Sequence, residues 1–331
     1  MKHRYIVGAC ALGLSATFAQ AQSFVKIYGV ADAGIVLERG GPAGSTENVS
    51  SGVASGSRLG FKGKEDLGDG TSAFFVLENG INMDTGTAGQ GGRLFGRQAL
   101  VGLTGAAGSV SLGRQYAPYY KVVRDVVDPF CTGLAGNAQN LFPTFTRVDN
   151  SVEYQTPKWH GVSADVLYGV GEAAADATKN RTIGASVGYD AGPLTLVLVH
   201  HQQGDPTGTA HSRNTMLAGR YRFGVVTAHA AYARNRDVLG NASRDALLGL
   251  AVKAGAGRVL ASLVVHRDDF GREAHARQAA IGYEYSLSRH TDLYAAYGHI
   301  VNRDGAAYTV GNATDAGAGT TGINLGVRHV F

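Results

Sequence analysis

Hydrophobic and polar residues alternate with a period of two along most of this chain, which is the spacing of strands with one apolar face. In 323–331, Ile323, Leu325 and Val327 share one face, and Arg328 lies on the other. No segment of similar length carries apolar residues at the 3.6-residue spacing of an amphipathic helix. The pattern therefore predicts an all-β fold. Other clear examples are 162–168, 217–223, 248–253 and 281–285.

Turn-forming residues divide the alternating segments into pairs. Seven short connections, such as 105–108 and 255–257, alternate with eight longer polar ones, such as 38–50, and leave 16 strands. An even strand number with both termini on the short-turn side is typical of outer-membrane barrels. Strands can span a bilayer only as a closed barrel, because lipid offers no partner to unpaired backbone groups. A soluble β-sandwich of this length would need two cores and a linker, and no linker is visible.

The connection 115–147 is the longest in the chain and carries Asp125, Asp128 and Cys131. A loop of this length is uncommon inside a compact domain, because most connections are shorter than about 12–15 residues. In a 16-stranded antiparallel transmembrane β-barrel it would be the long third loop, and we expect it to fold into the lumen and narrow it.

The N-terminus has the features of a secretory signal peptide. Two basic residues precede the mostly apolar run 5–18, and 19–21 is an Ala-x-Ala cleavage signal. The apolar run is too short for a transmembrane helix. We predict a signal peptide over 1–21 and one barrel domain over 22–331. Cleavage would leave Cys131 as the only cysteine, so the mature subunit would contain no disulfide.

Composition excludes several other classes of protein. The mature chain would keep 28 of the 30 Lys and Arg residues against 26 acids, a net charge near +2 with no basic cluster, so we predict no nucleic-acid binding. A mean hydropathy of −0.06 is too low for a helical membrane protein. Gly184–Gly188 matches the G-x-S-x-G of hydrolases, but it lies in an alternating strand rather than a strand–turn–helix. The sequence predicts no enzyme, metal site or cofactor.

Six motifs of the mature chain resemble the Gram-negative trimeric general porins, in particular their beta-proteobacterial branch. They are Ile-Tyr-Gly-Val-Ala-Asp-Ala-Gly at 27–34 and the segments 57–63, 65–70, 97–103, 108–115 and 147–154. The terminal aromatic Phe331 is also typical of such barrels and is the expected C-terminal assembly signal. The resemblance implies a bacterial outer-membrane location, a homotrimer, and contact with outer-membrane lipid, lipopolysaccharide and the barrel assembly machinery. It also implies passive diffusion of small hydrophilic solutes and ions.

Strand parity predicts which basic side chains face the pore. Arg58 and Lys62 should point inward if Leu59 faces lipid, and Arg147 should point inward if Val152 does. Within 97–103, an outward Leu100 would place Arg97 inward together with Val101. The resemblance implies a pore eyelet in which a basic wall faces acids on the third loop. The matching positions are Arg58, Arg97 and Arg147 for the wall, with Lys62 added by parity, and Asp125 and Asp128 for the loop.

Three basic wall residues against two loop acids favour an anion preference, although Asp32, Glu78 and Glu153 are expected as further lumen acids. Arg114 shares the parity of lipid-facing residues, so it should contact a neighbouring subunit or lie just above the bilayer. Two other functions stay open: a solute-selective channel of the same fold, and a surface adhesion or receptor barrel.

Overall fold

The computed structural model describes residues 23–42, 44–173, 176, 178–269 and 274–331, so the expected signal peptide lies outside the described residues. The described chain forms one antiparallel sheet with short helices in two of the connections between strands. No helix among the described residues is long and apolar enough to cross a bilayer. The strands are β1 Phe24–Gly41, β2 Gly44–Ser51, β3 Arg58–Gly68, β4 Thr71–Gly80, β5 Gln98–Gly105, β6 Gly108–Tyr116, β7 Arg147–Gln155, β8 Val162–Gly169, β9 Thr182–Ala191, β10 Leu194–Gly204, β11 His211–Phe223, β12 Val226–Arg236, β13 Ala242–Ala254, β14 Gly257–Asp268, β15 His275–Ser286, β16 Thr291–Arg303 and β17 Thr321–Val330. The helices are α1 Gly89–Gly92, α2 Pro118–Val122, the π-helical η1 Val123–Val127 and the 3-10 helix η2 Ala138–Asn140.

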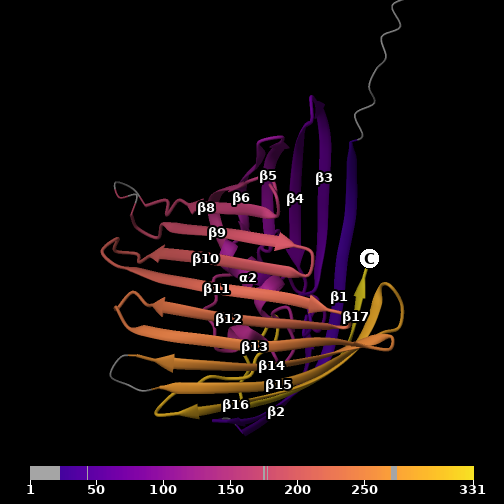
Figure 1. Ribbon diagram of the computed structural model, residues 1–331. Coiled ribbons are helices and arrows are strands. Elements are labelled where there is room, and N and C mark those ends of the chain that lie inside the picture. The colour runs from indigo at the N-terminus through magenta and orange to yellow at the C-terminus, as the bar shows by residue number, and fades with distance from the viewer. Residues whose placement is uncertain (1–22, 43, 174–175, 177, 270–273) are drawn as a thin grey trace, which may run out of the picture.

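The sheet closes on itself through β1. One edge of β1 pairs with β17, and the other pairs first with β3 and then with β2. Strands β2 and β3 therefore form one interrupted barrel strand, which makes this a barrel of 16 antiparallel strands and confirms the predicted strand number and architecture of the wall. The terminal Phe331 and Gly29 exchange backbone hydrogen bonds of 3.0 and 3.1 Å at the seam. Figure 1 shows the C-terminus beside β1.

The expectation of a long loop over 38–50 is wrong. Most of this polar stretch continues β1 and β2 as a hairpin, in which Thr46 donates a 3.0 Å hydrogen bond to the Glu38 carboxylate. The polar side chains did not end the strands, because backbone pairing is indifferent to side-chain polarity. The chain leaves the ladder instead at 52–57, where Val53 is completely buried.

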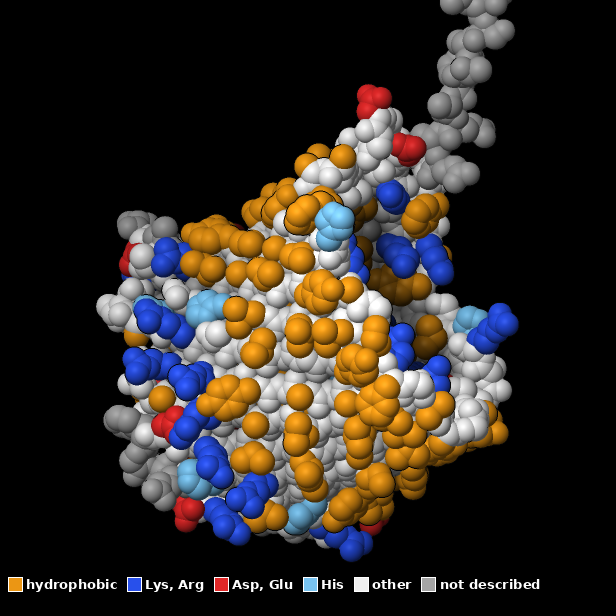
Figure 2. Space-filling view, in the orientation of Figure 1, with side chains coloured by type: hydrophobic (Ala, Val, Ile, Leu, Met, Phe, Trp, Pro, Cys, Tyr) orange, Lys and Arg blue, Asp and Glu red, His pale blue; other side chains and the backbone are white. Residues whose placement is uncertain are grey.

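The outward face of the barrel is apolar, as the alternation predicts. Large side chains such as Leu217, Leu248, Leu263 and Ile281 are 56–66% exposed. Figure 2 shows hydrophobic side chains spread over the middle of this wall. Such a surface is stable against hydrocarbon and would be unfavourable in water.

The segment between β6 and β7, which contains α2, η1 and η2, packs on the inner face of the barrel wall. Val126 accepts a 2.8 Å hydrogen bond on its carbonyl oxygen from His229 of β12, with the imidazole Nδ1 as donor. The side-chain amide of Gln278 on β15 donates to the carbonyl oxygens of Gly136 and Asn137 at 3.1 and 3.2 Å. Figure 1 shows α2 behind the middle strands, and α2 contacts β8, β9 and β10.

Part of the inner wall is apolar, which the sequence analysis did not anticipate. Met216, Leu247 and Leu260 point inward from β11, β13 and β14 and are at most 1% exposed. They belong to one buried cluster with Tyr119 and Val123 of the segment between β6 and β7. Strands β10 to β14 therefore carry apolar residues on both faces, one for the membrane and one for the segment.

Candidate functional site

A polar cavity of about 830 Å³ lies between the wall formed by β1, β3, β4 and β7 and the segment that follows β6. Its cationic side chains are Lys26, Arg58, Lys62, Arg97, Arg124 and Arg147. Glu78 is the only acidic side chain among the described lining residues. The formal charges of the lining side chains therefore sum to about +5, and this net charge attracts anions and repels cations.

Arg97 and Glu78 form the buried centre of this cluster. The Arg97 side chain donates to the Glu78 carboxylate at 2.7 Å from Nε and to the Tyr116 hydroxyl at 2.8 Å. Arg58 lies 3.8 Å from the same carboxylate, and Arg147 donates to the Arg97 carbonyl oxygen at 2.8 Å. Arg97 and Glu78 are only 6% and 4% exposed, so each compensates the desolvation of the other.

Tyr116 and Tyr120 contact the guanidinium groups of Arg124 and Arg147. The Tyr116 ring stacks on Tyr120 with centroids 5.0 Å apart. Arg147 lies 4.9 Å and Arg124 5.3 Å from the centre of the Tyr116 ring. Cation–π contacts of this kind offset part of the repulsion between like charges and fix the guanidinium groups at the cavity surface.

The parity argument for Arg97 was wrong, although Arg97 does line the cavity. Val101 and Leu103 are the outward residues of β5, at 57% and 55% exposed, while Leu100 lies on the inner face with Gln98. Arg97 precedes β5 in a bend, so strand alternation does not govern its direction. Its backbone N–H instead donates to the Glu78 carbonyl oxygen at 3.1 Å, which brings the two side chains together.

The structure contradicts the expected acidic face of the third loop. Asp128 is 1% exposed, and its carboxylate accepts hydrogen bonds of 2.9 Å from the backbone N–H groups of Phe130, Thr132 and Ala138. It organises the loop rather than facing a channel. Burial raises the pKa of the Asp128 carboxyl to about 6, and these three donors oppose the rise.

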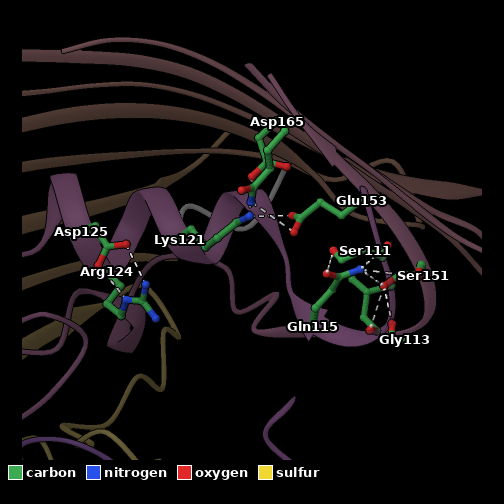
Figure 3. Close-up of polar contacts among 11 residues, drawn as sticks. Ser111, Gly113, Gln115, Lys121, Arg124, Asp125, Ser151, Glu153 and Asp165 are labelled. Atoms are coloured by element: carbon green, nitrogen blue, oxygen red, sulfur yellow. Dashed lines mark hydrogen bonds and ion pairs between the residues drawn. The ribbon is translucent and has the colours of Figure 1, made fainter. Parts of the chain in front are cut away.

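Asp125 is also placed differently from the expectation. Its carboxylate is bound by two nitrogen atoms of the neighbouring Arg124, both at 2.7 Å (Figure 3). It lines a separate cavity of about 300 Å³ with Lys121 and Asp165. The acid that meets the basic wall is thus Glu78, on β4, rather than a loop residue.

The two other acids expected in the lumen anchor irregular segments to the wall. Asp32 accepts hydrogen bonds of 2.8–3.2 Å from the backbone N–H groups of residues 53–55 and one of 2.8 Å from the Tyr294 hydroxyl. Glu153 pairs with Lys121 of α2 at 2.6 Å, and Lys121 also pairs with Asp165 on β8 (Figure 3). These contacts attach residues 53–55 and helix α2 to the inner face of the wall.

Arg114 does not point freely outward. A bulge interrupts the pairing of β6 with β7 between Gly113 and Gln115, so the expected parity ends there. Arg114 pairs with Asp149 and donates to the Gly96 carbonyl oxygen at 2.7 Å. Its charge is therefore compensated within the chain, and a role at a subunit interface stays a prediction.

Sequence reasoning missed Lys26, Arg124, Tyr116 and Tyr120. Lys26 shares the parity of inward residues on β1, so alternation could have found it. Arg124 belongs to the interior segment, and its direction depends on how that segment packs. No local pattern in the sequence predicts how this segment packs.

Comparisons with known proteins agree with this architecture. A family model described as Gram-negative porin matches residues 8–305. The chain belongs to the Gram-negative porin family. This porin is 31% identical to an outer membrane porin protein of Bordetella pertussis over the full length of both chains. It is also 31% identical to outer membrane porin protein 32 of Delftia acidovorans, over 95% of each chain.

Among solved structures, the porin resembles an anion-selective porin from Comamonas acidovorans, with a TM-score of 0.81 and 28% identity over 94% of this chain and 100% of that one. It shares its fold with a trimer form of OmpT from Vibrio cholerae, at a TM-score of 0.72 and 19% identity over 93% and 99% of the two chains. The resemblance found in the sequence is confirmed, and the protein is an outer-membrane porin.

Proposed function

We propose that this porin is a general diffusion channel that prefers anions. The observation that carries the proposal is the charge of the cavity, whose described lining includes six cationic side chains and one acidic side chain. The segment between β6 and β7 narrows the lumen beside this cavity, because it packs against the inner face of β9 to β12 and is hydrogen-bonded to β15. Ions and small hydrophilic solutes pass through this neck without catalysis.

The field in such a neck acts on both the sign and the polarity of a solute. Cations concentrated on one wall, with low-dielectric protein behind them, raise the local concentration of anions and lower that of cations. Apolar solutes would have to displace ordered water and gain little from the charged wall. The anion preference of the Comamonas relative supports the same direction of selectivity.

Planar-bilayer recording of the purified protein tests the proposal. In a tenfold KCl gradient, the reversal potential should have the sign of chloride preference, and conductance should rise with salt without saturating. A reversal potential with the sign of potassium preference would contradict the anion preference. Conductance that saturates, or that a particular solute blocks, would instead establish a solute-selective channel.

We also propose that the porin assembles as a homotrimer. The trimer form of a structural relative supports this, as do the small side chains Ala31 and Ala33 on β1, whose register places them with the outward Ile35. Light scattering of the folded protein in detergent should give three times the mass of one subunit. A conducting species with the mass of a single subunit would contradict the trimer.

A further inference from the structure

Seven arginines form a continuous row on the outer face of β11 to β16, near the ends that carry the longer loops. All seven are exposed, and no lysine interrupts the row in these strands. Figure 2 shows the basic side chains gathered at this edge of the wall, at the left of the view. The row consists of Arg213, Arg234, Arg236, Arg244, Arg267, Arg277 and Arg303.

The register of the sheet places five of these seven arginines directly opposite another arginine. Arg213 pairs with Arg236, and Arg234, Arg244 and Arg267 are paired in sequence across β12, β13 and β14. Like charges at directly opposed positions destabilise a sheet. Among the described residues, only Arg244 has a carboxylate partner in this row, Asp269. The arrangement is unfavourable unless an anion from outside the chain lies over it.

The row also contains a shaped cavity. A hollow of about 170 Å³ is lined by Arg267, Arg277, Arg303 and His275, with Val265 and Val301 also in its wall. No described carboxylate lines it. Guanidinium groups bind phosphate through two parallel N–H···O bonds, and three of them around one small hollow match a phosphate or pyrophosphate group.

An apolar groove lies on the same wall, on the short-turn side of this hollow. It has a volume of about 720 Å³, and its outward lining includes Leu248, Leu263, Ala279, Ile281 and Tyr297. Ala279 is the next outward residue after Arg277 on β15, and Leu263 is the next after Val265 on β14. The groove forms where small alanine side chains lie between larger apolar ones. Its apolar lining is suited to binding acyl chains.

The height of the row agrees with a lipid headgroup. On β15, Arg277 is eight residues from the outward Tyr285 at the short-turn end. Eight residues extend about 27 Å along a strand, or about 20 Å along the normal of a tilted barrel, close to the apolar band of about 25 Å in outer-membrane barrels. Arg277 therefore lies at the outer boundary of the bilayer.

We propose that this surface binds a phosphorylated lipid of the outer leaflet, with one headgroup phosphate in the arginine hollow, the second over the adjoining arginines of the row, and its acyl chains in the groove beneath. This site lies on the outer wall and is separate from the channel. It assigns a position on the barrel to the lipid contact, and the chemistry selects a lipid with two phosphate groups over a neutral one.

Native mass spectrometry of the folded, delipidated protein in detergent tests this directly. The probes are diphosphoryl lipid A, its monophosphoryl form, and free pyrophosphate. We expect the diphosphoryl lipid to bind at least tenfold more tightly than the monophosphoryl form. Binding of pyrophosphate as tight as that of the lipid would overturn the proposal, because it would show a site for free anions.

Variants separate the site from the general charge of the protein. Arg267→Ala with Arg277→Ala should weaken binding of the diphosphoryl lipid at least tenfold. The control, Arg222→Ala with Arg289→Ala, removes the same charge at the short-turn end and should leave binding unchanged. An equal loss in both double variants would refute the site. Conductance equal to that of the wild type shows that each variant is folded.

Two further variants keep the test decisive if the double alanine variant fails to fold. Arg277→Lys preserves the charge but not the paired hydrogen bonds, so it should weaken lipid binding severalfold. Ala279→Phe should fill the groove and weaken lipid binding while pyrophosphate binding stays at its wild-type level. Wild-type lipid affinity in both variants would overturn the proposal.

Discussion

Replacing Arg97 tests whether net charge in the cavity sets the selectivity of this porin. Arg97→Ala lowers the summed charge of the lining side chains from about +5 to about +4, because six cations and one carboxylate line the cavity. Glu78→Gln raises it to about +6, and the double variant restores about +5. We therefore expect anion preference to decrease in Arg97→Ala, to increase in Glu78→Gln, and to return to the wild-type value in the double variant.

The expected size of the change follows from Coulomb's law. Two unit charges about 6 Å apart interact by about 0.7 kcal/mol in water and by about 0.4 kcal/mol after screening in 0.1 M salt. Removing one cation disfavours anions and favours cations by this amount. The anion-to-cation permeability ratio of Arg97→Ala should therefore fall about fourfold in 0.1 M salt and about tenfold at low salt.

The same three variants should also differ from one another in their free energy of unfolding. Arg97→Ala leaves Glu78 buried with Arg58 at 3.8 Å as its nearest cation, and losing one partner of a buried pair costs about 3–5 kcal/mol. The double variant leaves no buried carboxylate at position 78, so it should lose less stability than the two single variants combined. Thermal unfolding in detergent measures the stabilities, and reversal potentials in asymmetric KCl measure the selectivity.

One pattern of results would refute the reasoning. If Arg97→Ala and Glu78→Gln shift the reversal potential in the same direction, pore shape rather than charge sets the selectivity. If the double variant keeps the selectivity of Arg97→Ala, the two residues do not act through their summed charge.

Three further predictions concern the interior segment. Cys131 lines the cavity, so a sulfonate-bearing thiol reagent should lower anion preference and a trimethylammonium-bearing one should raise it in bilayer recordings; no effect of either would place the thiol away from the ion path. Asp128→Ala leaves three buried N–H donors unpaired and should destabilise the fold by about 3 kcal/mol in thermal unfolding, so an unchanged midpoint would contradict its structural role. Lys121→Met leaves Glu153 and Asp165 without the cation between them and should make single-channel current noisier, whereas the exposed-pair control Lys158→Met should not; equal noise in both would argue against the anchor.

The sequence alone determined the wall of this protein. Alternation depends only on neighbouring positions in one strand, so it correctly placed Leu217, Leu248 and Ile281 on the outer face. The order of short and long connections gave the strand number, because a closed barrel in lipid leaves few other solutions. Arg58 begins a regular strand and lines the cavity, whereas a bulge separates Arg147 from the residues used to count its parity, although Arg147 lines the cavity too.

The tertiary structure decided the interior. Arg97 reaches the cavity from a bend, and Arg114 lies beside a bulge, so neither direction follows from counting along a strand. Asp125 and Asp128 were acids in the expected loop, but only packing showed that one pairs with Arg124 and the other binds backbone N–H groups. Local spacing fixes which face a strand residue takes, whereas the path of a long segment is set by contacts between residues far apart in the chain.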